Sequence, residues 1–220
     1  MARYSLLVFA GLSFGCNQDI KTPFPAGLEP LEQNKASYPS GSGYPEKLSC
    51  KSGVDEEEEF GEYTWVHCKT YVKSPIADVY DAYLVPRVVA DRRALDEMTV
   101  EWDVEPEYEH SFKLSNTVYD VITVEFDVNW RHGALDGNID APQEVGSRWQ
   151  KTFGSEVIEL LRGSIYTQAI EDDVTGVEFI SHQRTLQDDE PLMMDYLNDL
   201  QADIVAESKG QSLPSYPSGV

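Results

Sequence analysis

The chain has 220 residues, of which 41% are hydrophobic and 11% aromatic, enough for one sizeable domain and too apolar for a disordered acidic chain. Asp and Glu total 39 against 17 Lys and Arg, so the formal net charge is −22. Nucleic acid and anionic lipid both attract clustered cations, so this balance excludes nucleic acid as a partner and charge-driven binding to an anionic membrane.

The N-terminus is typical of a secretory signal peptide. Arg3 precedes an apolar run from Tyr4 to Phe14, which is shorter than the roughly 20 residues of a membrane-spanning helix. Its end, Leu12-Ser13-Phe14-Gly15-Cys16, resembles the lipobox of bacterial lipoproteins, although Leu12 lies one position early and Phe14 replaces a small residue. The resemblance implies removal of residues 1–15 and lipidation of Cys16, with an ordinary secretory signal as the alternative.

A lipidated Cys16 would hold the protein on a membrane of the bacterial cell envelope, inner or outer, facing the periplasm. Cys50 and Cys68 then remain as an even pair in an oxidising compartment. A disulfide closing this loop of about 19 residues would stabilise the fold by about 3 kcal/mol. We favour the disulfide over two free thiols. The sequence alone does not show whether the two Cα atoms lie within bonding distance.

Residues 16–60 are predicted to form a lipidated, Pro/Gly-rich and acidic linker or strap. Five prolines and Gly41-Ser42-Gly43 favour a tether, whereas Phe24, Leu28 and Leu31 would allow part of it to dock. The run of acids from Asp55 to Glu59 indicates a solvated loop.

Regular structure begins near Tyr63, where alternating residues predict a strand through Val72. Ser74 as N-cap and Pro75 as first helical residue predict a helix that Pro86 ends, and a second short helix is expected over Val88–Leu95. Further strands are expected over Val100–Val104, Phe112–Val121, Ile122–Trp130, Arg148–Phe153, Val157–Ile170 and Val177–Leu186. A helix over Glu190–Ser208 carries one apolar stripe, and residues 210–220 form a flexible tail.

This order of elements, with Lys73-Ser74-Pro75-Ile76-Ala77-Asp78-Val79-Tyr80 at the first strand-to-helix junction, resembles the START-like (SRPBCC) superfamily. The resemblance covers about residues 61–209. It implies an α+β helix-grip fold, in which a curved antiparallel sheet of six to seven strands wraps a long C-terminal helix. Two short helices follow the first strand.

The resemblance also implies a cavity for an apolar or amphipathic ligand. The side chains expected to line it are Trp102, Phe126, Trp130, Tyr166, Phe179, Met193 and Leu197. The alternative is a solid core that these large side chains fill themselves.

Few residues suggest other chemistry. His67, His110, His132 and His182 lie far apart in sequence without metal-ligand spacing, so neither a metal nor a cofactor is expected. Arg131 and Arg148 could hold a ligand carboxylate or phosphate, or could pair with the many surface acids.

The sequence therefore favours a non-catalytic envelope lipoprotein that binds a hydrophobic, lipid-like small molecule, with a membrane as its partner through Cys16. The first alternative is a cyclase or dehydratase of the same fold, which would need a polar residue such as His182, Arg162 or Tyr166 inside the cavity. The second is an interaction module with a closed cavity, whose protein partner the sequence does not identify.

Overall fold

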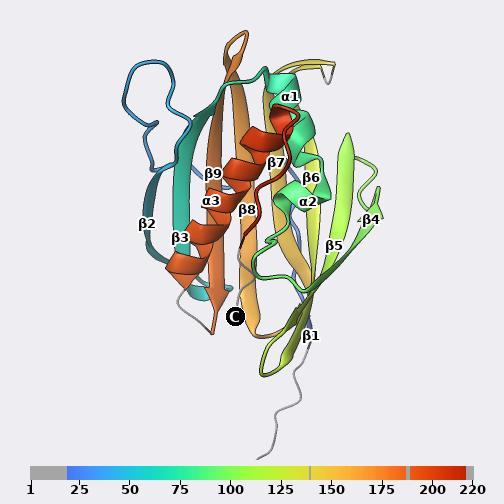
Figure 1. The fold of residues 1–220 in the computed structure, drawn as a ribbon. Helices are drawn as coiled ribbons and strands as arrows, with labels where there is room; N and C mark the ends of the chain where they lie inside the picture. Colours follow the sequence, from blue (N-terminus) through green and yellow to red (C-terminus); the bar gives the residue numbers. More distant parts are fainter. Residues whose placement is uncertain (1–18, 139, 187–188, 217–220) are drawn as a thin grey trace, which may run out of the picture.

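A computed structural model describes residues 19–138, 140–186 and 189–216, which form one antiparallel sheet and three helices (Figure 1). The strands are β1 (Asp19–Lys21), β2 (Ser49–Glu57), β3 (Gly61–Val72), β4 (Glu97–Trp102), β5 (His110–Tyr119), β6 (Thr123–Asn138), β7 (Ala141–Ser155), β8 (Ile158–Glu171) and β9 (Val174–Thr185). Their order is β2-β3-β9-β8-β7-β6-β5-β4, and β1 pairs with the end of β7 that β8 leaves uncovered.

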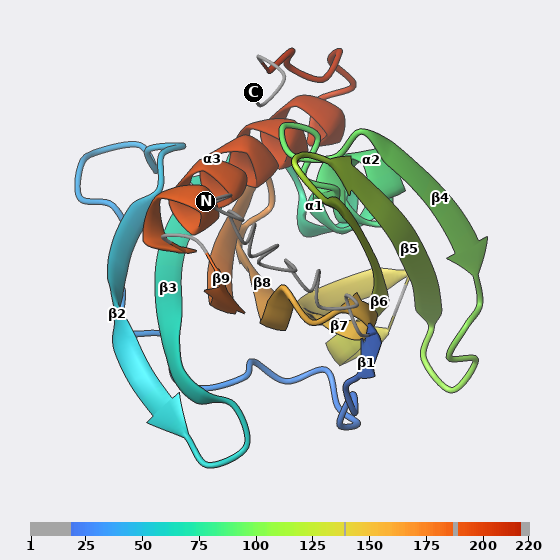
Figure 2. The same cartoon turned by 90° about the horizontal axis from the view of Figure 1, so that it is seen from below.

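The helices lie on the inner face of the sheet. α1 (Ile76–Tyr83) and α2 (Pro86–Val89) follow β3, and α3 (Asp189–Ser208) follows β9. Seen from below, the sheet curves and α3 crosses its open side, in contact with β3, β9 and both short helices (Figure 2). Met193, Leu197, Leu200 and Ile204 form the buried stripe of α3, as their helical spacing predicts. The helix-grip arrangement expected from the sequence is therefore confirmed.

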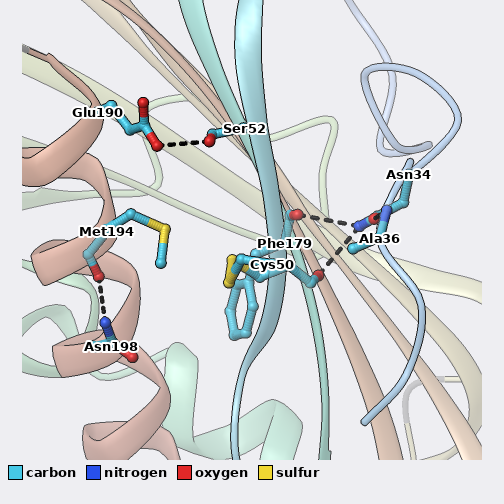
Figure 3. The surroundings of a disulfide bond; sticks show 9 residues. Asn34, Ala36, Cys50, Ser52, Phe179, Glu190, Met194 and Asn198 are labelled. Atoms are coloured by element: carbon cyan, nitrogen blue, oxygen red, sulfur yellow. Dashed lines mark hydrogen bonds between the residues drawn. A yellow bond between two sulfur atoms is a disulfide. The ribbon is translucent and has the colours of Figure 1, made fainter.

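The strap, residues 22–48, runs along the outer face of the sheet. Its Leu31 N–H donates to Ser164 Oγ at 3.2 Å, and its Asn34 side chain donates to the carbonyls of Cys68 and Phe179, both at 3.1 Å (Figure 3). The alternation of the strands predicts that the outward-facing residues are exposed to solvent. The strap covers some of them, so that His67 is fully buried. The described part of the predicted linker therefore contributes β1, the strap and β2 to the folded body.

Two local predictions at the helices are wrong. The second short helix spans Pro86–Val89 rather than Val88–Leu95, because Pro86 begins that helix, where its missing N–H costs no hydrogen bond. Ser74 does not cap α1 with its side chain. Its hydroxyl donates to the carbonyl of Lys73, and Pro75 occupies the N-cap position.

The disulfide between Cys50 and Cys68 is present, which confirms the pairing favoured by the sequence. The two residues face each other across β2 and β3, and their Cα atoms lie 4.1 Å apart. The bond fastens the edge strand β2 to the sheet, and Phe179 lies against it on the inner side (Figure 3).

Candidate functional site

A cavity of about 390 Å³ lies between the inner face of the sheet and the helices. Its wall comes from β5 to β9, the segment after α2, and the first turns of α3. Apolar side chains form most of that wall: Val89, Leu95, Leu114, Val118, Val124, Phe126, Val128, Trp130, Trp149, Val157, Ile158, Leu161, Leu186 and Leu192. The volume falls within the range of small-molecule sites, so this cavity is the candidate ligand site.

Two stacked indoles line the cavity. Trp130 and Trp149 are paired across β6 and β7, with ring centroids 4.8 Å apart and ring planes inclined by 17°. Gly163 on β8 leaves room for Trp149, since a Cβ at that position would lie 1.9 Å from the indole ring. The Trp149 indole therefore lies over Gly163 with the Trp130 ring stacked against it, and both rings share the cavity wall with Leu192 and Tyr196 of α3.

The polar groups of the wall are few. The Tyr196 hydroxyl donates to the carbonyl of Val89 at 2.9 Å. Asn116 is 4% exposed; its Nδ2 donates to the Leu114 carbonyl at 3.2 Å, whereas its Oδ1 has no hydrogen-bond partner among the described residues. Burial raises the pKa of Asp91, whose Oδ1 accepts the N–H groups of Arg93 and Ala94. Among the lining residues in the described part of the chain there is no Lys, Arg or His.

The expected lining residues fall into three groups. Phe126 and Trp130 line the cavity. Phe179, Met193 and Leu197 are buried in the core where α3 packs against the sheet, outside the cavity wall.

Trp102 and Tyr166 do not line the cavity, which corrects the prediction. Trp102 lies on the edge strand β4, is 55% exposed, and touches the rest of the sheet through Phe112. Tyr166 lies on the outer face of β8, where Glu144 and Glu178 approach it, and Ile165 takes the inward position. The strap buries the outer face of β8 as well, so apolar alternation cannot reveal which face is inside.

Sequence reasoning missed Asn116, Leu161 and Tyr196 as wall residues. The position of Asn116 could have been predicted from the sequence. It lies at every second position with Phe112, Leu114 and Val118, so its side chain points to the same inner face of β5. Tyr196 and Leu161 line the cavity because of where α3 crosses the sheet and how β8 is paired with its neighbours, and neither arrangement can be read from the sequence.

The residues named for an enzyme are not in the cavity. His182 and Arg162 lie on the outer face, where the guanidinium Nε donates to His182 Nδ1 at 3.2 Å and another guanidinium nitrogen donates to Glu57. Tyr166 shares that face. These three residues therefore cannot act on a molecule bound between the sheet and α3.

The outer face instead contains the Glu32 latch, formed by Glu32, His67 and His182. The Nε2 atoms of His67 and His182 lie 3.1 and 3.0 Å from Glu32 Oε1. The two histidines are 115 positions apart in the sequence, and pairing of β3 with β9 brings them together, with ring centroids 6.2 Å apart.

The hydrogen bonds of the latch do not fit a metal site. His67 Nδ1 accepts the Lys35 N–H at 2.9 Å, and His182 Nδ1 accepts from Arg162, so each ring carries its proton on Nε2 and donates it to Glu32. A metal on the two Nε2 atoms would move that proton to Nδ1, where another donor already points. Burial lowers the pKa of His182 to about 3, with Arg162 adding to the effect, and burial also lowers the pKa of His67. In the latch, two neutral histidines of the sheet therefore donate hydrogen bonds to the Glu32 carboxylate, which attaches the strap to β3 and β9.

The arginines considered for a ligand anion also lie outside the cavity. Arg131 is 3% exposed, lies 2.7 Å from Glu105, and donates to the strap carbonyl of Pro25 at 2.7 Å. Arg148 lies close to Gly27 of the strap. Both residues therefore contact the strap on the outer face of the sheet, and Arg131 also pairs with Glu105.

Cys16 and the leader lie outside the described residues, so lipidation stays a prediction. Within the ranges that the structure describes, no helix is both long and apolar enough to cross a membrane.

No protein-family model matches the chain, and no curated protein matches it. Several solved structures resemble the chain at low sequence identity. The lipid transfer and protein localization domain of human StarD13 is 10% identical with a TM-score of 0.48, covering 81% of this chain and 89% of that one. Human StAR-related lipid transfer protein 5 is 10% identical with a TM-score of 0.47 (80% and 84% covered). The Zhui aromatase/cyclase from a Streptomyces species is 11% identical with a TM-score of 0.42 (66% and 91% covered).

The architecture itself identifies the fold. A strand leads into two short helices, six antiparallel strands follow, and the long final helix crosses the open side of the curved sheet. The chain therefore carries a domain of the START-like, helix-grip fold.

Proposed function

We propose that this protein binds a neutral, mostly apolar small molecule in the cavity beneath α3, without changing it chemically. The observation that supports this proposal is the apolar cavity of about 390 Å³ bounded by Trp130, Trp149 and the first turns of α3. Transfer of apolar surface from water contributes about 25 cal/mol per Å². A ligand that covers this wall therefore gains affinity without any strong polar contact.

The charge of the wall selects a neutral ligand. Asp91 and Asp120 are its carboxyl side chains, and no described lining residue is cationic. A carboxylate or phosphate inside the cavity would therefore be desolvated without a counter-charge, which is costly. A fatty-acid anion is accordingly a poor occupant, whereas a long-chain alcohol is compatible with the wall.

Asn116 gives such a ligand its orientation. Its buried Oδ1 accepts no hydrogen bond from the part of the chain that the structure describes, and an unmet buried acceptor costs about 1–3 kcal/mol. A ligand hydroxyl that donates to Oδ1 would recover part of this cost. Asp91 needs no ligand to explain its burial, because it accepts the N–H groups of its own turn.

We further propose that Cys16 carries the lipid anchor, so that the domain works at a membrane of the bacterial envelope. The lipobox-like end of the leader and the disulfide between the two remaining cysteines support this localisation.

Binding can be tested with 1-dodecanol, dodecyl methyl ether and dodecanoate as probes, read through tryptophan emission. We expect 1-dodecanol to bind best, because the ether lacks the donor and the carboxylate carries the charge. Leu161→Trp places an indole in the cavity and should abolish binding, whereas Tyr166→Phe on the outer face should leave it unchanged. Equal binding by Leu161→Trp and the unmodified protein would overturn the proposal.

The role of Asn116 has its own test. Asn116→Leu should keep binding of dodecyl methyl ether and lose the preference for 1-dodecanol. A preference that survives the substitution would show that another group receives the hydroxyl.

A further inference from the structure

The exposed part of the cavity wall gathers at one end of the sheet. Asp120 and Ile122 stand in the β5–β6 hairpin, Leu186 follows β9, and Leu192 lies in the first turn of α3; all four line the cavity and are exposed. Here the cavity opens to the outside.

This opening is surrounded by exposed apolar side chains, which we call the mouth surface: Val121, Ile122, Leu186 and Leu192. They are 96%, 49%, 75% and 45% exposed. Large apolar side chains left together in water are unfavourable, and such a patch marks a surface that contacts a partner or a membrane.

The chain enters the domain at this same end. Asp19 pairs with Ser155, the last residue of β7, and β1 lies beside the β5–β6 hairpin at the lower end of Figure 1. Cys16 precedes Asp19 by three residues, which span at most about 11 Å.

The opposite end of the domain is too far away to meet a membrane held through Cys16. β8 has 14 residues, which extend about 45 Å. Its far turn at Asp172 and Asp173 therefore lies several times farther from Cys16 than the tether can reach. An anchor at Cys16 brings the bilayer to the end that carries the mouth surface.

We propose that the mouth surface rests on the bilayer that holds the Cys16 lipid, so that a ligand passes between bilayer and cavity without crossing water. The inference builds on the anchor that we propose above. Asp120, Glu125, Glu156 and Glu159 lie at this end, so the favoured surface is one of zwitterionic rather than anionic lipid.

The test uses the mature, full-length chain in vesicles of phosphatidylethanolamine and phosphatidylcholine with brominated acyl chains. A polarity-sensitive fluorophore is placed on Val121→Cys, on Leu186→Cys and, as matched control, on Asp172→Cys at the far turn. We expect bromine quenching and blue-shifted emission at 121 and 186, and neither at 172.

Three outcomes would overturn the inference. A chain that floats with the vesicles but shows no quenching at 121 and 186 refutes the orientation while leaving the anchor intact. A chain that does not float refutes the anchor and the orientation together, although cavity binding of 1-dodecanol is judged separately. Blue-shifted emission at 121 without vesicles, in a species of dimer mass, would mean that a second copy covers the mouth surface.

Discussion

Removal of the Glu32 carboxylate should loosen the strap and lower the stability of the domain. Glu32 accepts one hydrogen bond from each of two buried histidines, His67 and His182. Hydrogen bonds to a charged acceptor contribute about 1.5–3 kcal/mol each. The Glu32 side chain is 32% exposed, and water screens the pair. We therefore expect Glu32→Ala to lower the free energy of unfolding by about 2–4 kcal/mol.

Two variants define the origin of this loss. Glu32→Gln keeps an acceptor oxygen without the charge and should cost only about 1 kcal/mol. Gln33→Ala changes the exposed neighbour in the strap and should stay within about 0.5 kcal/mol of the unmodified protein.

Denaturant unfolding gives the free energies, and amide hydrogen exchange locates the change. The N–H groups of Leu31 and Lys35 donate to Ser164 and His67, so their exchange should accelerate in Glu32→Ala. A free energy of unfolding that falls no further in Glu32→Ala than in Gln33→Ala would show that the latch does not hold the strap.

Three further effects follow from the structure. Replacing Cys50 and Cys68 by alanine should lower stability by about 3 kcal/mol in denaturant unfolding, by the loop-entropy estimate; an unchanged midpoint would contradict it. Gly163→Ala should displace the Trp149 indole and cost about 1–3 kcal/mol, visible as altered tryptophan emission together with the loss. The pKa of His182 is lowered to about 3, so the unfolded chain takes up the proton first and stability falls as the pH drops below about 6.5. Between pH 6.5 and 5, His182→Gln should flatten this fall by up to about 1.4 kcal/mol per pH unit, and an unchanged slope would refute the neutral latch.

The fold could be predicted because the clearest periodic patterns of apolar residues occur in helices and strands that bury one face in the core. The stripe of Met193, Leu197, Leu200 and Ile204 gives α3, and the alternation from Val66 to Val72 gives the inner face of β3. β2 escaped prediction because its acids, Asp55 to Glu57, lie on an edge strand without a regular apolar alternation.

The site was predictable only in part. Phe126 and Trp130 lie on the strand with the clearest alternation, and the structure places both in the cavity wall. Tyr166 was misplaced because the strap removes the contrast between the two faces of β8. The Glu32 latch depends on strand register and on a strap without regular structure, neither of which leaves a local sequence signal.

A crystal structure of the chain, purified from its own membrane without denaturation, tests the central claim most directly. We expect electron density for a neutral, lipid-like molecule between the Trp130–Trp149 stack and the first turns of α3, with a polar atom within hydrogen-bond distance of Asn116 Oδ1. A cavity closed by rearranged side chains, or filled with ordered water alone, would contradict it.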